Sequence, residues 1–342
     1  MLVRARAPLR LGLGGGGTDV SPYCDEYGGN VLNATIDRYA YAVIRRLDSQ
    51  FVRLVSTDQA RYQEFPCVEF IPHDGNLDLH KAVYNEIISV YNNGRPVPIE
   101  MTTFCDAPVG SGLGASSTLV VAMIKAFTEF FNLPLDDYAI AQMAFKIERI
   151  DCKLKGGRQD QYSATFGGFN FMEFYDGQRA VINPLRIKSW VICELEASLV
   201  LFYTGVSRQS EKIISDQSEN MQKLTTDAME PFHGLKREAR QMKECLLRGE
   251  LGGFVESMRQ GWENKKRSAA TVSNAGIDEI YNAALKSGAT AGKVSGAGGG
   301  GFMIFFVPPE RRMDVIRALN NYQGQVSNAH FSPNGAQAWK IL

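Results

Sequence analysis

The chain carries few of the residues that would mark a metalloprotein, a disulfide scaffold or a membrane protein. Its six cysteines are scattered without a C-x-x-C pair, and its four histidines are dispersed. We therefore expect no zinc site, and reduced thiols in a cytoplasmic protein. No segment stays apolar for ~18 residues, so we expect no membrane-spanning helix. The basic residues near the N-terminus are not followed by the apolar core of a signal peptide.

Net charge is absent as well, because 37 lysines and arginines balance 37 aspartates and glutamates. This balance argues against nucleic acid or an anionic membrane as the main partner. A chain of 342 residues with 44% hydrophobic residues has the composition of a soluble globular protein and the length of two domains. Because the composition changes near residue 185, we expect the domains to span 1–185 and 186–342.

Glycine is abundant and is concentrated in three segments. Segment 12–19 reads Gly-Leu-Gly-Gly-Gly-Gly-Thr-Asp, and segment 293–302 reads Lys-Val-Ser-Gly-Ala-Gly-Gly-Gly-Gly-Phe. Between them, segment 108–119 reads Pro-Val-Gly-Ser-Gly-Leu-Gly-Ala-Ser-Ser-Thr-Leu and precedes a helical pattern of apolar residues. A glycine loop at a helix N-terminus presents backbone N–H groups and the positive end of the helix dipole, which favours phosphate.

Segment 108–119 therefore predicts a phosphate-binding loop. It lacks Gly-Lys-Ser/Thr, so it is not a Walker A motif. A serine hydroxyl at the start of the helix can hold Mg²⁺, and it can also serve as an N-cap. The expected nucleotide contacts are Pro108, Gly110, Ser111, Gly112, Leu113, Gly114, Ala115, Ser116 and Ser117.

Residues 12–17 also fit the dinucleotide-binding pattern G-x-G-x-x-G, with Asp37 twenty residues further on. That fingerprint requires a helix directly after the glycines. Segment 18–22, Thr-Asp-Val-Ser-Pro, and the glycine pair at 28–29 leave no room for such a helix. We therefore reject a Rossmann oxidoreductase.

The order of the three glycine segments, with these residues, resembles that of the GHMP small-molecule kinases, such as galactokinase and mevalonate kinase. The resemblance covers nearly the whole chain. It implies an α+β fold with a mixed α/β N-terminal domain, a ferredoxin-like C-terminal domain of helices on a sheet, and the active site between them. It also implies ATP and Mg²⁺ as cofactors, and it leaves a homodimer open.

Within this resemblance, segment 156–163, Gly-Gly-Arg-Gln-Asp-Gln-Tyr-Ser, is similar to the family's catalytic loop. Asp160 would accept the proton of the acceptor hydroxyl or hold that hydroxyl in line. Arg10 matches the basic residue of the first motif and would offset charge on the transferring phosphoryl group. By register, Ser116 is the metal-binding serine, with Ser117 a close competitor. Glu148 matches the second metal ligand, although its spacing to the aspartate is one residue longer than in some relatives.

The strings at 7–23 and 27–36 are similar to those of the kinases that act on D-glycero-D-manno-heptose 7-phosphate. Segments 204–210 and 262–268 support this branch, and fucokinases share part of it. The resemblance implies phosphorylation of the anomeric C1 hydroxyl in nucleotide-heptose synthesis. Two alternatives stay open: another anomeric sugar kinase such as a fucokinase, or a catalytically silent sugar or nucleotide sensor on the same fold.

The acceptor contacts expected from the same resemblance are Gly16, Gly17, Thr18, Asp19, Arg158, Gly298 and Gly299. A phosphate on the acceptor would need a cationic pocket, because a dianion is buried only with compensation. The basic candidates for this pocket are Lys153, Lys155, Arg158, Arg208 and Lys265.

Periodicity and turn residues predict the order of the elements. Strands are expected at 2–11, 31–47, 51–56, 99–105, 190–203, 301–307, 325–331 and 337–342. Helices are expected at 79–92, 116–131, 135–153, 277–287 and 310–320, with a charge-rich helical region from 207 to 267.

Overall fold

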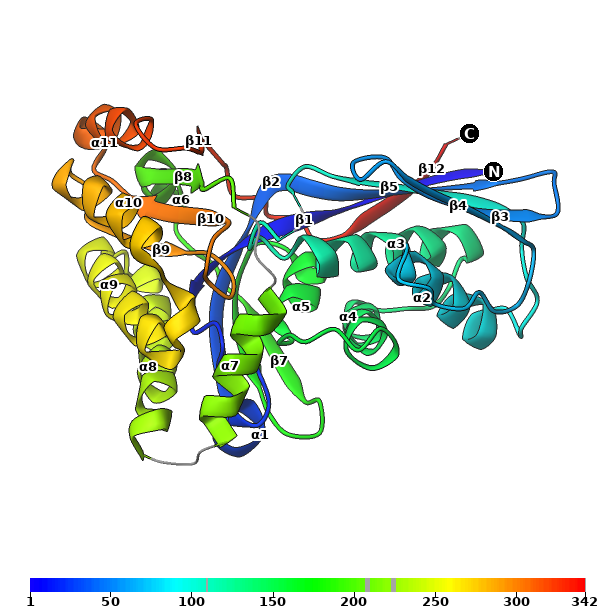
Figure 1. Cartoon of the computed structure of the whole chain (residues 1–342), viewed down its shortest axis with the longest axis horizontal. Coiled ribbons are helices and arrows are strands. Elements are labelled where there is room, and N and C mark those ends of the chain that lie inside the picture. The colour runs from blue at the N-terminus through cyan, green and yellow to red at the C-terminus, as the bar shows by residue number, and fades with distance from the viewer. Residues whose placement is uncertain (109, 207–209, 223–225, 342) are drawn as a thin grey trace.

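The computed structural model describes residues 1–108, 110–206, 210–222 and 226–341, and it shows two sheets with helices packed on them (Figure 1). In these residues the larger sheet has eight strands. Its main path runs β12-β1-β2-β5-β3-β4, and β6 and β7 extend from β2. The strands are β1 Leu2–Gly14, β2 Gly29–Arg46, β3 Phe51–Ser56, β4 Arg61–Pro66, β5 Ile99–Cys105, β6 Phe169–Phe174, β7 Ala180–Pro184 and β12 Gln337–Ile341.

The two long strands β1 and β2 form the centre of this sheet, and β2 continues beyond the segment that pairs with β5. The second half of β2, residues 40–46, pairs with β5, whereas its first half, residues 29–34, pairs with β6. The pairing of β1 with β2 shifts register between Pro8 and Arg10, next to a proline that has no N–H to donate. Arg10 thus follows an irregularity, and β1 continues from it toward the second half of the molecule.

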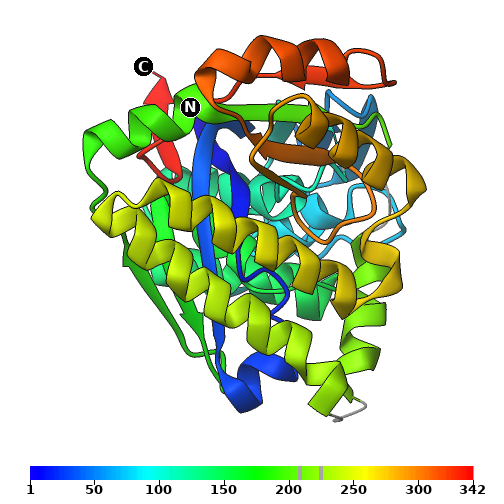
Figure 2. The same ribbon diagram turned by 90° about the vertical axis from the view of Figure 1, so that its left-hand side faces the viewer.

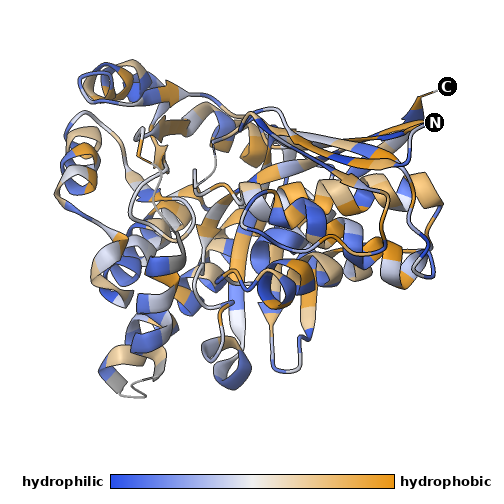
Figure 3. Ribbon diagram, turned by 45° about the vertical axis from the view of Figure 1, so that its right-hand side comes forward, coloured by the Kyte–Doolittle hydropathy of each residue, from blue (hydrophilic) through white to orange (hydrophobic). Residues whose placement is uncertain are grey.

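Helices cover one face of the larger sheet (Figure 1). The longest, α3, packs on β1 and β2 through buried residues such as Val120, Ile124 and Phe127. These residues recur at helical spacing, and Figure 3 shows how hydrophobic this helix and the central strands are. The helices of this half are α1 Tyr23–Tyr27, α2 Asp78–Glu86, α3 Ala115–Phe131, α4 Asp137–Lys146 and α5 Gln159–Phe166, with π-helical turns Ile87–Tyr91 and Ile147–Asp151.

The smaller sheet is antiparallel, in the order β11-β8-β10-β9. Its central strand β10 is buried on both faces: Ile304 belongs to one apolar cluster and Met303 and Phe305 to another. Helices α8 and α9 lie side by side (Figure 2), and α9 packs on β9 whereas α8 packs on β1 and β2 of the larger sheet. Its elements are α6 Ser189–Ser198, β8 Leu199–Tyr203, α7 Ser210–Gln222, α8 Thr226–Arg248, α9 Leu251–Ser268, the 3₁₀ turn Ala270–Val272, α10 Ala275–Lys286, β9 Ala291–Val294, β10 Phe302–Phe306, the 3₁₀ turn Pro309–Arg311, α11 Arg312–Leu319 and β11 Gln325–Ser327.

The structure confirms the α+β fold and corrects one expected element. Segment 190–203 was predicted as one strand, but it is α6 followed by β8. The prediction was wrong because Val191 and Leu195 are buried four residues apart on one helix face, a pattern that the many β-branched and aromatic residues obscured. The helical region after residue 207 forms three helices in its described part, and Pro231 lies inside α8.

The last strand returns to the first sheet. β12 pairs antiparallel with β1, with Leu2 opposite Ile341. The division into 1–185 and 186–342 stays a prediction, and any division must assign residues 337–341 to the larger sheet. No helix in the described residues is long and apolar enough to cross a bilayer.

Candidate active site

A cavity of about 480 Å³ lies where the three glycine-rich segments meet. Gly17 lines it from the turn after β1, Gly112 from segment 108–119, and Gly296 from the turn after β9. The last two turns touch: a Cβ on Gly112 would lie 2.5 Å from the carbonyl oxygen of Ser295. The glycines therefore let the backbones of distant segments approach each other, which larger residues would prevent.

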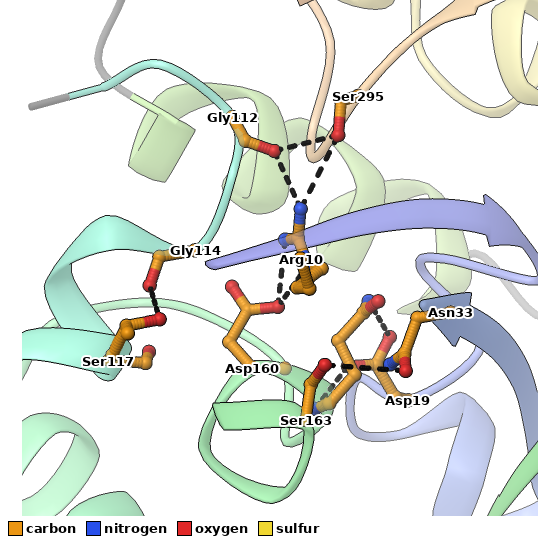
Figure 4. Close-up of polar contacts among 12 residues, drawn as sticks. Arg10, Asp19, Asn33, Gly112, Gly114, Ser117, Asp160, Ser163 and Ser295 are labelled. Atoms are coloured by element: carbon orange, nitrogen blue, oxygen red, sulfur yellow. Dashed lines mark hydrogen bonds and ion pairs between the residues drawn. The ribbon is translucent and has the colours of Figure 1, made fainter. Parts of the chain in front are cut away.

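Arg10 and Asp160 form an ion pair in this cavity (Figure 4). Nε and Nη2 of Arg10 both lie 2.7 Å from Oδ1 of Asp160, so the guanidinium engages one carboxylate oxygen. Nη1 of Arg10 donates to the carbonyl of Gly112 at 2.6 Å and to Oγ of Ser295 at 3.4 Å. Because its side chain is only 4% exposed, the guanidinium is fixed among these acceptors. The second oxygen of Asp160 is left facing Gly114 (Figure 4).

The resemblance places Asp160 in a catalytic loop, but in the structure it is the second residue of helix α5. The helix is short and has no capping side chain of its own, which is why the sequence pattern missed it. Its cap comes from Asp19, whose Oδ2 accepts hydrogen bonds from the backbone N–H groups of Arg158 (2.9 Å) and Gln159 (3.1 Å). The helix that carries Asp160 is therefore anchored from a distant part of the chain.

Asp19 was expected to bind the acceptor through its carboxylate. In the structure its Oδ1 also accepts from the N–H of Gly17 (3.1 Å) and from Nε2 of Gln159 (3.2 Å). Four donors thus engage the two oxygens, and the residue is 1% exposed. The carboxylate lines the cavity, but its hydrogen bonds hold the turn after β1 against α5.

The predicted phosphate loop lies at the N-terminus of α3, as expected for an anion site. Gly110, Gly112 and Gly114 have φ of +74°, +79° and +78°, values that favour glycine. A Cβ on Gly114 would come within 3.3 Å of Oδ2 of Asp160. The loop residues that line the cavity are Gly110, Ser111, Gly112, Gly114, Ala115, Ser116 and Ser117.

The buried carboxylate of Glu148 and the exposed hydroxyl of Ser116 offer oxygen atoms beside this loop. Oγ of Ser116 donates to Oε1 of Glu148 at 2.9 Å, and Nε2 of Gln161 donates to Oε2 of Glu148 at 2.5 Å and to Oγ of Ser117 at 3.1 Å. Glu148 is 1% exposed, and Nη1 of Arg149 lies 3.8 Å from Oε1 of its carboxylate. A hydroxyl and a carboxylate at a phosphate loop are hard oxygen ligands that fit Mg²⁺, which takes one or two protein ligands and completes its shell with phosphate and water. In the described residues no group of three or more acidic, histidine or cysteine side chains forms a metal cage.

Comparison with known proteins identifies the family. Residues 78–168 match the N-terminal domain of the GHMP kinases, and residues 242–324 match their C-terminal domain. The chain is also 45% identical, over 99% of both chains, to a D-glycero-alpha-D-manno-heptose 7-phosphate kinase of Campylobacter jejuni subsp. jejuni serotype O:2. The chain belongs to the GHMP kinase family. GHMP kinases are ATP-dependent phosphotransferases, so this chain is a kinase.

Two further relatives support the assignment. A solved structure described as a D-glycero-D-manno-heptose 1-phosphate kinase from Bacteroides thetaiotaomicron superposes with a TM-score of 0.85, at 43% identity and 99% coverage of both chains. An L-fucokinase/L-fucose-1-P guanylyltransferase of Bacteroides fragilis is 26% identical over 93% of this chain and 36% of its own.

In this GHMP kinase several predicted contacts do not line the cavity. The side chain of Arg158 binds Asp25 at 3.1 Å and the carbonyl of Tyr175 at 2.8 Å. The hydroxyl of Thr18 donates to the carbonyls of Gly15 and Asn30. These two side chains are used to hold the surrounding backbone.

Other residues predicted to contact the nucleotide or the acceptor also do not line the cavity. Leu113 lies in the apolar core, and its carbonyl accepts the N–H of Arg10. Gly298 and Gly299 pack on Val272, and the residues of that segment that line the cavity are Gly296 and Ala297. Pro108 and Lys153 do not line it either, and Arg208 lies outside the described residues.

The kinase cavity also contains residues that sequence reasoning did not place there. Gln159 and Gln217 line it, and Gln161 and Ser295 orient Glu148 and Arg10. The glutamines on either side of Asp160 could have been predicted as site residues from the sequence. If this segment is a helix, the two glutamines lie on different faces of that helix. Ser295 and Gln217 carried no such signal, since their roles depend on contacts with distant segments.

Proposed function

We propose that this kinase transfers the γ-phosphoryl group of ATP to the anomeric C1 hydroxyl of D-glycero-D-manno-heptose 7-phosphate, giving the 1,7-bisphosphate for nucleotide-heptose synthesis. The observation that carries the reaction type is the ion pair of Arg10 and Asp160 beside the N-terminus of α3. The heptose as acceptor is supported by the 45% identity to the Campylobacter kinase over nearly the full length of both chains.

The chain's own residues supply the positioning that phosphoryl transfer requires. The free oxygen of Asp160 accepts the hydrogen of the acceptor hydroxyl, and the hydrogen bonds from Arg10 to the other oxygen hold that carboxylate in its orientation. The acceptor oxygen then bonds to the γ-phosphorus as the bond from that phosphorus to the bridging oxygen breaks and ADP leaves. The proton passes to Asp160. An anomeric hydroxyl is more acidic than an ordinary alcohol, which suits a carboxylate base.

The remaining charge is balanced by the phosphate loop and by Arg10. The backbone N–H groups of residues 114–117 face the phosphates at the positive end of α3. Ser116 and Glu148 would hold Mg²⁺, which, when bound, neutralises the β- and γ-phosphate oxygens. Gln161 fixes the carboxylate of Glu148, so the metal ligands stay at the mouth of the loop.

The two heptose kinases that this chain resembles carry different names, one for the 7-phosphate and one for the 1-phosphate. The test is therefore ADP release with Mg-ATP and five acceptors: heptose 7-phosphate, heptose 1-phosphate, free heptose, L-fucose and galactose. We expect turnover on the 7-phosphate. Turnover on the 1-phosphate or on L-fucose instead would overturn the proposed acceptor, and turnover on none would favour a silent sensor.

A further inference from the structure

Lys265 of helix α9 is a buried lysine that lines the cavity. The residue is 5% exposed, and its Nζ donates to the carbonyl of Gly16 at 2.8 Å. This is the one hydrogen bond that its ammonium makes within the described residues, and it has no ion-pair partner there. An ammonium has three donors, so the geometry leaves donors for a ligand.

The turn after β1 leaves space next to this ammonium. Gly17 has φ of +105°, and a Cβ built on it would lie 3.3 Å from Nζ of Lys265 and 3.7 Å from Oε1 of Gln217. Gln217 of α7 is itself buried, and Ser268 fixes its amide at 2.7 Å. A side chain at residue 17 would fill this space, so the glycine keeps the ammonium accessible from the cavity.

The electrostatics around Lys265 also favour an anion. Burial, together with the charge of Arg10, lowers the pKa of Lys265 to about 8. Burial, together with the charges of Lys265 and Arg10, lowers the pKa of Lys293 on β9 to about 7. The charge of Asp19 raises the pKa of Lys265, but the oxygens of Asp19 already accept hydrogen bonds from four N–H donors. Buried positive charge without a paired carboxylate is unfavourable, and an incoming anion relieves it.

The position of Lys265 separates it from the nucleotide side of the cavity. Its hydrogen bond goes to the turn after β1, whereas Arg10 contacts the phosphate loop through the carbonyl of Gly112. Asp160 lies between these two sides, paired with Arg10 on one side and capped through Asp19 on the other. An anion at Lys265 therefore belongs to the acceptor.

We propose that Lys265, with the turn Gly16–Gly17, binds a phosphate group carried by the acceptor sugar. The inference rests on the proposed function, because it takes a sugar phosphate as the acceptor. It assigns to Lys265 the selection of phosphorylated over free sugars. Lys293, which does not line the cavity, acts only through its charge.

The experiment compares Lys265→Met with the wild-type kinase. Titration calorimetry gives the Kd of heptose 7-phosphate and of free heptose, and steady-state kinetics gives the KM for ATP. Loss of a charge-assisted hydrogen bond predicts that the Kd of the 7-phosphate rises about 10- to 100-fold. The Kd of free heptose and the KM for ATP should change less than about threefold. Lys265→Arg keeps the charge and should restore part of the discrimination.

Lys266→Met is the matched control. Lys266 is the next residue of α9 and pairs with Glu263 at 2.9 Å, outside the cavity. It should leave both Kd values unchanged. Lys293→Met removes a neighbouring buried charge and should raise the Kd of the 7-phosphate less than Lys265→Met does.

Three results would overturn the inference: equal losses for both sugars, a rise confined to the KM for ATP, or no change in any constant. The proposed function is judged separately, by wild-type turnover on heptose 7-phosphate. If Lys265→Met lost affinity for the 7-phosphate while the wild type failed to phosphorylate it, the phosphate subsite would stand and the proposed reaction would fall.

Discussion

Asp19 caps the helix on which Asp160 lies, although 141 positions separate them in the chain. The carboxylate of Asp19 binds the N–H groups of residues 158 and 159, and Asp160 follows directly. The orientation of the expected base therefore depends on a residue that makes no contact with Arg10 in the described hydrogen bonds. In this arrangement Asp19 holds the helix that carries Asp160, and it does so without having to bind the acceptor.

Asp19→Asn tests that separation. The amide NH₂ replaces an oxygen that accepts two N–H donors, so we expect a loss of about 1–3 kcal/mol in the free energy of unfolding. Because α5 is loosened, kcat should fall about 10-fold or more while the KM for the acceptor changes little. A rise confined to the acceptor KM would instead indicate that Asp19 binds the sugar. Asp136→Asn, at the N-cap of α4, is the control and should leave kcat unchanged.

Asp160→Asn removes the carboxylate that faces the acceptor. We expect kcat to fall about 10²- to 10⁴-fold, the range of a general base, while ATP binding stays within a few-fold. Asp25→Asn breaks a comparable ion pair, with Arg158 at 3.1 Å, outside the cavity, and should keep kcat. Retained turnover in Asp160→Asn would remove the residue from its proposed role.

Glu148→Gln keeps the size of the side chain but removes its charge. The concentration of Mg²⁺ needed for half-maximal turnover should rise about 10- to 100-fold, and binding of Mn²⁺ with ATP, followed by electron paramagnetic resonance, should weaken in parallel. Glu129→Gln removes a carboxylate that pairs with Lys340 on the outside of α3 and serves as control. An unchanged metal requirement would place the metal elsewhere.

Gly112→Ala tests the contact between two glycine turns. Gly112 has φ of +79°, and a Cβ there would lie 2.5 Å from the carbonyl oxygen of Ser295. Gly177 has φ of +63°, with nothing within 4 Å of its Cβ position. Both alanine variants carry a backbone penalty of about 1–2 kcal/mol. We expect Gly112→Ala to lose more free energy of unfolding than Gly177→Ala and also to raise the KM for ATP. Equal losses would show that the turn tolerates the side chain.

The pH dependence of acceptor binding follows from the lowered pKa of Lys265. With a pKa of about 8, its ammonium is mostly protonated at pH 7 and loses its charge as the pH rises through 8. A sugar phosphate is already a dianion above pH ~6. The Kd for heptose 7-phosphate should therefore rise above pH 8, with Arg10, Asp19 and Lys293 as the charged groups facing the ammonium. In Lys265→Met the rise in Kd above pH 8 should be much smaller, because only Lys293 still titrates nearby, and an unchanged profile would exclude Lys265 as its source.

The parts of the site that the sequence predicted are those whose chemistry is local. The loop predicted to bind phosphate can be recognised because its glycines and the first turn of α3 are consecutive, and Arg10, Asp160 and Glu148 lie inside recognisable motifs. What it missed depends on distant contacts. The cap of α5 comes from Asp19, Arg10 is held by Ser295, and Arg158 turned away because Asp25 and the carbonyl of Tyr175 bind it.

The same distinction applies to the fold. The continuous apolar run of β10 and the apolar stripe of α3 identify these elements without any partner. Segment 189–198 is helical because its two buried residues face the core at helical spacing, which becomes visible only once the neighbouring sheet is known. The return of β12 to β1 is likewise a long-range pairing that local patterns do not encode.

The most direct test of the account is ³¹P and ¹H NMR of the product formed from Mg-ATP and D-glycero-D-manno-heptose 7-phosphate. The account predicts a second phosphate resonance whose phosphorus couples to the anomeric proton, with one ADP released for each sugar consumed. A new phosphate on any other carbon, or ADP release without a phosphorylated sugar, would contradict it.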